Sequence, residues 1–132
     1  MPAPVQSPEV STLVTRPTVN APGLAREFVA KCFCDLGVAD DYVVKIVVTE
    51  LVTNVHKHVK VGRIVIRVFE DERDDSVVVE VWDQGEELPV IREAEDMDVS
   101  GRGLFMMSLL VREWGVRPIS EGGKIVWAKL DR

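Results

Sequence analysis

Long apolar runs are missing from this sequence of 132 residues. No segment approaches the ~20 uninterrupted apolar residues that span a bilayer, and the first ten residues have neither a basic region nor an apolar core. We therefore expect no membrane segment and no secretion signal. Cysteine is scarce as well, because the only two, Cys32 and Cys34, stand two positions apart and cannot close a structural loop. This excludes a disulfide scaffold and predicts a reduced, cytoplasmic protein.

Basic residues are rare in the middle of the chain. Between Glu70 and Asp98 there are 13 acidic and two basic residues, a net charge of −11 that leaves +5 for the rest of a chain whose total is −6. A nucleic-acid-binding protein normally presents a basic face, so this distribution argues against such a partner. Two interpretations of the acidic stretch stay open: a surface for a basic protein partner, or a solvated acidic face.

What remains is an ordinary globular composition, with 46% hydrophobic and 29% charged residues. A chain of this length favours one domain and buries about two-thirds of its unfolded surface, enough for a core without covalent staples. The first residues are rich in proline and small side chains. We expect a flexible tail over residues 1–9 and a single domain over residues 10–132.

Hydrophobic periodicity predicts three helices and five strands. The helices are expected over residues 20–36, 40–59 and from residue 100 onward, and the strands over residues 10–16, 63–70, 76–83, 115–120 and 124–130. Asn20 or Thr18 is the expected cap of the first helix and Asp40 that of the second. The order predicts a two-layer α/β (α+β) sandwich with a mixed sheet, covered on one face by three helices.

Two of the helices have a defined apolar face in this prediction. The second has a single stripe, and the third is expected to bring four side chains to one side. The stripe of the second helix consists of Val44, Val47, Val48, Leu51, Val55 and Val59, and the face of the third consists of Leu104, Met107, Val111 and Trp114.

A polar ladder runs beside the apolar stripe of the second helix. Glu50, Asn54 and His58 are spaced by four residues, so they lie along one side of that helix. A carboxylate and an amide in this arrangement suit proton abstraction and metal coordination, and Mg²⁺ takes oxygen ligands while sharing phosphate oxygens with the protein. A merely solvated polar face is the alternative interpretation.

The end of the strand predicted over residues 76–83 places an acidic residue and a glycine together. Asp83 can accept a hydrogen bond from an exocyclic amine, and Gly85 lets a planar ring approach the backbone. A simple strand-ending turn fits the same residues. Sequence spacing alone leaves both interpretations open.

A glycine-rich segment opens the third helix. Gly101 and Gly103 flank Arg102 and precede Leu104, so several backbone N–H groups point outward at the positive end of the helix dipole. This arrangement favours an anion site, although a plain turn fits too. The segment lacks the Lys-Ser/Thr ending of a Walker A loop and does not match G-x-G-x-x-G.

Taken together, the three patterns resemble a known family. Glu50-x-x-x-Asn54, Asp83-x-Gly85 and Gly101-x-Gly103 resemble the N, G1 and G2 boxes of the GHKL ATPase/kinase superfamily. The GRGL run and the WGVRP…GGKIVWAKL run are similar to its anti-sigma-factor serine/threonine-protein kinase branch, and most of all to actinobacterial regulatory ATP-binding proteins. The resemblance covers roughly residues 10–131.

The resemblance implies a Bergerat-type fold that binds ATP and Mg²⁺ under a lid of about residues 86–100. It implies that Glu50 is the general base, that Asn54 binds Mg²⁺ and that Asp83 reads the adenine amine. Gly85 gives the ring clearance, and the segment from Gly101 to Leu104, with Arg102, contacts phosphates. The implied activity is phosphorylation of a STAS-type antagonist by a kinase that also sequesters a sigma factor.

Two positions depart from the family pattern. Glu87 stands where a second glycine of the G1 box is usual, and Ile125 stands where a threonine near the adenine is usual. Both changes predict weaker nucleotide binding. A non-catalytic, or weakly ATP-binding, module that acts by sequestration alone is therefore the alternative. The role of His58 and the oligomeric state, homodimer included, stay open.

Overall fold

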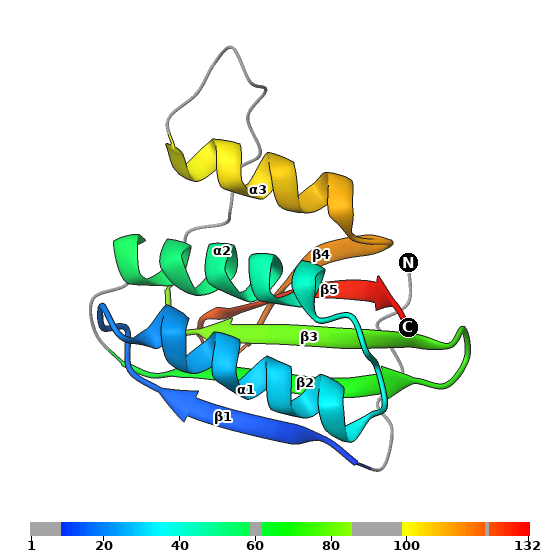
Figure 1. The fold of residues 1–132 in the computed structure, drawn as a ribbon. Helices are drawn as coiled ribbons and strands as arrows, with labels where there is room; N and C mark the ends of the chain where they lie inside the picture. Colours follow the sequence, from blue (N-terminus) through cyan, green and yellow to red (C-terminus); the bar gives the residue numbers. More distant parts are fainter. Residues whose placement is uncertain (1–8, 59–61, 86–98, 121) are drawn as a thin grey trace.

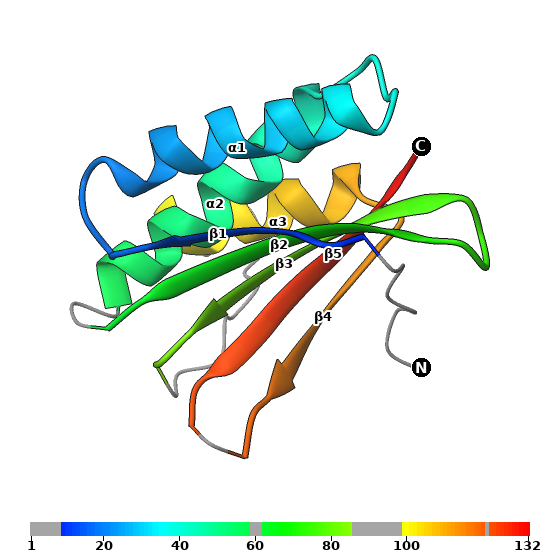
Figure 2. The same ribbon diagram turned by 90° about the horizontal axis from the view of Figure 1, so that it is seen from below.

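The computed structural model describes residues 9–58, 62–85, 99–120 and 122–132, with three helices on one face of a five-stranded sheet (Figure 1). In chain order the elements are β1 (Ser11–Thr15), α1 (Ala21–Asp35), α2 (Tyr42–His58), β2 (Ile64–Asp71), β3 (Ser76–Asp83), α3 (Val99–Leu110), β4 (Glu113–Pro118) and β5 (Lys124–Asp131). Figure 2 shows the other face of the sheet bare of helices. The predicted two-layer sandwich is confirmed. None of the helices in these ranges is both long and apolar enough to cross a membrane.

The sheet is antiparallel throughout, so the prediction of a mixed sheet is wrong. Its strand order is β1-β2-β3-β5-β4, and every neighbouring pair is antiparallel. The reason lies in the connection through α3, which carries the chain back along the sheet so that β4 runs in the same direction as β3 (Figure 1). Because β5 then folds back between these two strands, it pairs antiparallel with both.

The core lies between the helices and the sheet. The predicted stripe of α2 is confirmed for the residues from Val44 to Val55, each 7% exposed or less. It packs on alternate residues of the central strands, as the two-residue period of a strand requires. These strand residues are Ile64, Ile66 and Val68 of β2, Val77, Val79 and Val81 of β3, and Val126, Ala128 and Leu130 of β5. Each valine fully buried in this way contributes about 1.5–3 kcal/mol.

The ends of the first two helices differ slightly from the prediction. Asn20 is at the N-cap position of α1, but its side chain makes no capping hydrogen bond. The predicted cap of α2 is off by one residue, because the helix begins at Tyr42 and the carbonyl of Asp41 accepts its first hydrogen bond, from the N–H of Lys45. Asp40 still supports this end, since its side chain accepts a hydrogen bond from the backbone N–H of Tyr42 at 3.0 Å. Gly37, with a φ of 75°, follows the end of α1, where a glycine in the left-handed region is favourable.

The third helix is shorter than its apolar pattern suggests. It ends at Leu110, so Val111 and Trp114 do not extend its face, and that part of the prediction is wrong. Trp114 instead lies on β4 opposite Ala128, where it packs against the core with a two-residue period. A tryptophan four residues past the end of a helix can reach the same core from a strand, which is why helical spacing misled the prediction.

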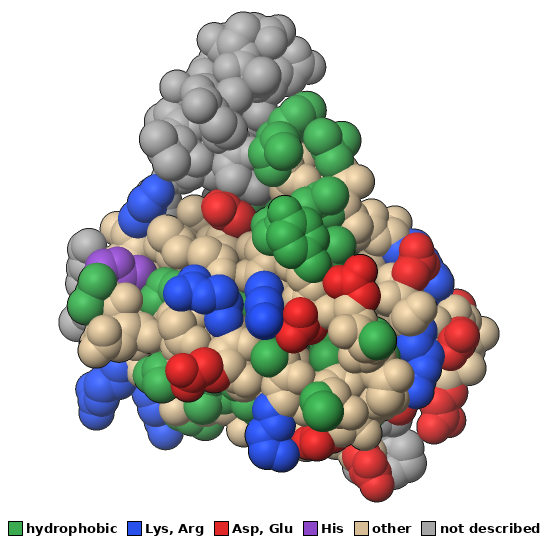
Figure 3. Space-filling model, in the orientation of Figure 1, with side chains coloured by type: hydrophobic (Ala, Val, Ile, Leu, Met, Phe, Trp, Pro, Cys, Tyr) green, Lys and Arg blue, Asp and Glu red, His purple; other side chains and the backbone are tan. Residues whose placement is uncertain are grey.

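Apolar side chains also gather on the outside of α3 (Figure 3). Met106, Leu109 and Leu110 are 51%, 65% and 41% exposed, whereas Met107 is fully buried. The prediction that Met107 belongs to the apolar face of this helix is therefore confirmed.

Ion pairs account for much of the acidic stretch. Glu80 lies between Arg67 at 3.2 Å and Arg117 at 3.6 Å on the bare face of the sheet. Further ion pairs of the acidic residues, on either face of the sheet or at its ends, are Glu70–Arg132, Asp71–Arg73, Asp71–Lys129, Asp74–Arg112, Asp74–Lys129 and Asp83–Lys124. Within residues 70–83 the negative charge is therefore largely matched inside the chain, an outcome that neither interpretation of the sequence included. Residues 86–98 lie outside the described part.

Candidate functional site

The elements that carry the predicted site residues come together at one end of the domain. At this end β3 finishes, β5 begins, α2 finishes and α3 begins (Figure 1). The antiparallel pairing of β3 with β5 brings the last residue of one strand opposite the first residue of the other, Asp83 opposite Lys124. Segments from both halves of the chain therefore contribute to the site.

Asp83 is the most enclosed polar residue of this group, with no exposed surface. One of its carboxylate oxygens, Oδ1, accepts hydrogen bonds from the backbone N–H of Gly85 at 2.8 Å and from Lys124 Nζ at 3.0 Å. The other oxygen, Oδ2, is buried and has no hydrogen-bond partner among the described residues. Because a buried acceptor normally has a partner, Asp83 presents one free oxygen for a donor from outside the chain.

The backbone after Asp83 is fixed by a contact with the start of β2. Gln84 Oε1 accepts a hydrogen bond from the N–H of Arg63 at 3.0 Å. Gly62 makes room for it, since a Cβ at this position would lie 1.8 Å from Gln84 Oε1. The central residue of the Asp83-x-Gly85 pattern therefore anchors this turn to the neighbouring strand.

Sequence reasoning missed Lys124, and it misplaced Ile125. The side chain of Ile125 packs against Phe69, Val78 and Trp127 in a second apolar cluster, so the prediction that it stands beside the adenine position is wrong. Side chains alternate along β5, and it is Lys124 that faces Asp83. No local spacing in the sequence signals this contact, because it depends on the antiparallel register that pairs Asp83 with Lys124.

Glu50 and Asn54 lie one turn apart on α2, and both are half-buried. Asn54 Oδ1 is inaccessible to solvent, and no group in the described part of the chain forms a hydrogen bond with it. Burial raises the pKa of Glu50 above its ordinary value of 4.5, while the positive charge of Lys57 partly opposes this shift. A carboxyl group with a raised pKa binds a proton more readily, as a general base requires.

The start of α3 supplies the third part of the site. The helix begins at Val99, so Gly101 is the last residue of the glycine-rich run whose backbone N–H lacks an intrahelical partner. Arg102 and Gly103 follow inside the helix, where the N–H of Gly103 faces the carbonyl of Val99 four residues earlier. Leu104 is 3% exposed and packs in the core, which anchors this end of the helix. The side chains of Arg102 and His58, and the proposed lid with Glu87, lie outside what the structure describes.

The free acceptors allow a direct test of whether ATP and Mg²⁺ fit. Asn54 Oδ1 and Asp83 Oδ2 are the two buried side-chain atoms in the described residues that lack a partner. An amide oxygen is a suitable ligand for Mg²⁺, and a carboxylate oxygen is a suitable acceptor for the amine of adenine. The residues present therefore fit the group that the sequence pattern implies.

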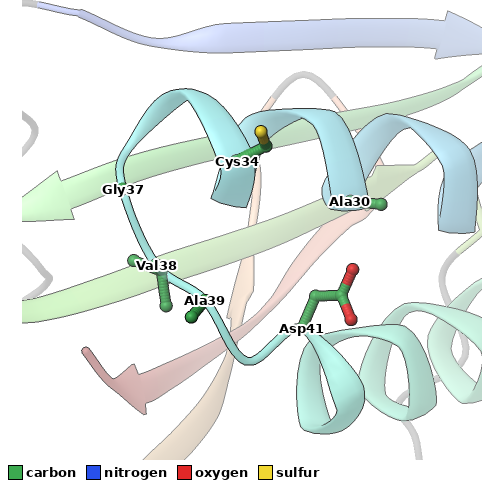
Figure 4. Close-up of a pocket in the computed structure, with 6 residues that line it drawn as sticks. All are labelled: Ala30, Cys34, Gly37, Val38, Ala39 and Asp41. Atoms are coloured by element: carbon green, nitrogen blue, oxygen red, sulfur yellow. The ribbon is translucent and has the colours of Figure 1, made fainter.

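A surface hollow lies at the opposite end of the domain, between the end of α1 and the start of α2 (Figure 4). It is lined by Ala30, Cys34, Gly37, Val38, Ala39 and Asp41. None of the predicted site residues lies there, so this hollow is separate from the site. Cys32 is buried nearby, and its burial raises the pKa of its thiol, which fits a packing role.

Comparisons with known proteins agree with this geometry. A family model described as "Histidine kinase-like ATPase domain" matches residues 16–130. Among solved structures, the chain is similar to a protein from Mycobacterium tuberculosis, Rv1364c, described by its RsbU and RsbW domains, with a TM-score of 0.67 and 20% identity. The match covers 93% of this chain and 32% of that one, so the chain spans about a third of its length. The comparison with curated proteins gives no match.

Proposed function

Because this chain belongs to the family of histidine kinase-like ATPase domains, we propose that it is an ATP-dependent serine/threonine-protein kinase that acts as an anti-sigma factor. It phosphorylates a STAS-type antagonist and sequesters a sigma factor. Membership in an ATPase family implies ATP binding in general. The narrower proposal is supported by the resemblance of the sequence to the anti-sigma-factor branch and by the fold shared with the RsbW-containing neighbour.

The single observation that carries the proposal is the carboxylate of Asp83, with one oxygen saturated and the other buried and free. Asp83 Oδ2 would accept a hydrogen bond from the amine of adenine. Asn54 Oδ1 would be the protein ligand of Mg²⁺. The free backbone N–H groups at the start of α3, up to that of Gly101, would hold phosphate oxygens, which is a common use of helix N-termini, and Gly103 would follow in the next turn.

Glu50 is the residue proposed to handle the proton. ATP bound with Mg²⁺ supplies the phosphoryl group, and most of the work of the protein is positioning. The half-buried Glu50 carboxylate would accept the proton from the serine or threonine hydroxyl of the antagonist. Its raised pKa makes it a stronger base than an exposed glutamate.

The test is a phosphorylation assay with the purified chain, Mg²⁺-ATP and a panel of STAS-type proteins. We expect phosphate on a serine or threonine of one partner with the wild-type chain, and none with Glu50→Gln. The Glu27→Gln variant removes an exposed glutamate from α1 and is the matched control. ATP binding without transfer to any member of the panel, together with tight binding of a sigma factor, would contradict the kinase and support sequestration alone.

A further inference from the structure

Lys124 and Asp83 form an ion pair that is almost sealed from solvent. Lys124 Nζ lies 3.0 Å from Asp83 Oδ1, and the two side chains are 10% and 1% exposed. By contrast, the pair Lys31–Asp35 on the surface of α1 is 77% and 63% exposed at the same distance. Burying two charges carries a large desolvation cost, and it is not needed to hold a sheet together. The pair Lys129–Asp71 elsewhere in the sheet is buried as deeply, so it is the place of Lys124 beside the unpartnered oxygen of Asp83 that points to a role in binding.

The pair determines which oxygen of Asp83 is free. Lys124 Nζ and the N–H of Gly85 both donate to Oδ1, which leaves Oδ2 as the unpartnered acceptor. An ammonium group has donors only, so Lys124 holds Oδ1 in an accepting role. Oδ2 is thereby the oxygen left to accept a hydrogen bond from a ligand.

The backbone is built to bring the two residues together. Gly123 has a φ of 93°, and a Cβ there would lie 2.2 Å from the carbonyl oxygen of Asp83. Only glycine permits the start of β5 to come so close to the end of β3. The next residue, Lys124, is then directly opposite Asp83 in the sheet register.

We propose that Lys124 is a positioning residue that makes the site selective for a purine with an amine at C6. This inference rests on the proposed function, since it takes the site to bind ATP. An amine donates to the fixed acceptor Asp83 Oδ2, whereas a C6 oxygen faces it as a second acceptor. A purine without either group leaves Oδ2 unpartnered.

The experiment compares nucleotides on three forms of the chain by calorimetric titration with Mg²⁺. The nucleotides are ATP, inosine triphosphate with oxygen at C6, and purine riboside triphosphate with hydrogen at C6. The variants are Lys124→Met and the control Lys129→Met. Lys129 is an equally buried lysine of the same strand, 5% exposed, but it pairs with Asp71 and Asp74 on the bare face of the sheet.

We expect the wild-type chain to prefer ATP over purine riboside triphosphate by about 10-fold or more, as the loss of a hydrogen bond to a charged group implies. Lys124→Met should reduce ATP affinity by about 10-fold and change the affinity for purine riboside triphosphate little. The ratio of the two affinities therefore falls toward one. Lys129→Met should keep the wild-type ratio, and so should any variant whose effect is only structural.

If the folded Lys124→Met variant keeps the wild-type ratio of the affinities for ATP and purine riboside triphosphate, the proposed role of Lys124 is overturned. The proposed function is then left intact. No ATP binding by the wild-type chain overturns both. If Lys124→Met does not fold, Lys124→Gln provides the same comparison, because it keeps an N–H donor without the charge. In that variant a fall in the ratio of at least about 3-fold is expected, and an unchanged ratio is the contrary result.

Discussion

Gly123 lies so close to Asp83 that a side chain has no room between them. A Cβ on Gly123 would be 2.2 Å from the carbonyl oxygen of Asp83, and the φ of Gly123 is 93°. The neighbouring Gly122 has a similar φ of 100° but nothing within 4 Å of its Cβ position. Glycine is required at position 122 by the backbone conformation alone, and at position 123 by both the conformation and the close contact.

Gly123→Ala should therefore destabilise the chain more than Gly122→Ala. A positive φ alone costs an alanine about 1–2 kcal/mol, and Gly123→Ala must in addition move the end of β3. Denaturant unfolding of both variants measures the difference. Because the clash involves the residue that is proposed to read the adenine, Gly123→Ala should also weaken ATP binding, while Gly122→Ala leaves it unchanged. Equal stabilities for the two variants would contradict this account.

Asn54→Ala should remove the effect of Mg²⁺ on ATP binding without destabilising the fold. The Oδ1 atom of Asn54 is buried with no partner, so its removal also removes an unsatisfied polar atom. We expect a loss of at least about 10-fold in ATP affinity when Mg²⁺ is present, and a smaller loss when it is chelated. Calorimetry with and without a chelator measures this, and Thr53→Ala on the same helix is the control. A marked fall in the melting temperature would instead indicate a structural role for Asn54.

Glu50→Gln should raise stability at neutral pH while it abolishes phosphoryl transfer. Burial raises the pKa of Glu50 in the folded state, so the folded chain binds this proton more tightly than the unfolded chain. The stability of the wild-type chain should therefore fall as pH rises from the ordinary value of 4.5 through the raised value. Glutamine does not titrate, so the advantage of the variant appears only above this window. Melting curves between pH 4 and pH 8 test the sign, and a lower melting temperature for the variant at pH 8 would contradict it.

The contribution of Asp74 to stability should be lost as pH falls, which is the opposite of the pH dependence expected for Glu50. Hydrogen bonds from Lys129 and then from Ser76 lower its pKa below the ordinary value of 3.8. A carboxyl group with a lowered pKa stabilises the fold above the ordinary value, and this contribution is lost as pH falls through the lowered value. Asp74→Asn should therefore flatten the stability curve below about pH 4. The exposed Asp75 is the control, and an Asp75→Asn curve that flattens as much would count against the Lys129 contact.

The sequence predicted most of the elements because hydrophobic periodicity is a local property. The valine stripe of α2 and the alternating pattern of β3 depend on local spacing, and the structure reproduces β3 at its predicted bounds. The direction of β5 relative to β3 depends on how α3 returns the chain, and nothing in local spacing encodes that. Local spacing also misled the prediction for Trp114, which continues the helical pattern of α3 in the sequence but lies on β4.

The candidate site was predictable in its residue types but not in its contacts. Asp83 and Asn54 were identified from their motifs, and the structure adds that each has a buried, unpartnered oxygen. Lys124 could not be found from a motif, because its importance comes from its contact with Asp83, which lies 41 positions earlier in the chain and is brought opposite it by the strand register. Ile125 was misplaced by one residue of that same register, and a shift of one residue in a strand moves a side chain to the other face.

The central claim is that Asp83 holds the adenine of ATP at the end of β3. Calorimetric titration of Mg²⁺-ATP into the wild-type chain and into Asp83→Asn, both shown to be folded, tests it most directly. We predict saturable binding by the wild-type chain and a loss of at least about 10-fold in the variant. No heat with the folded wild-type chain at millimolar nucleotide, or equal affinity in the two proteins, would contradict the account.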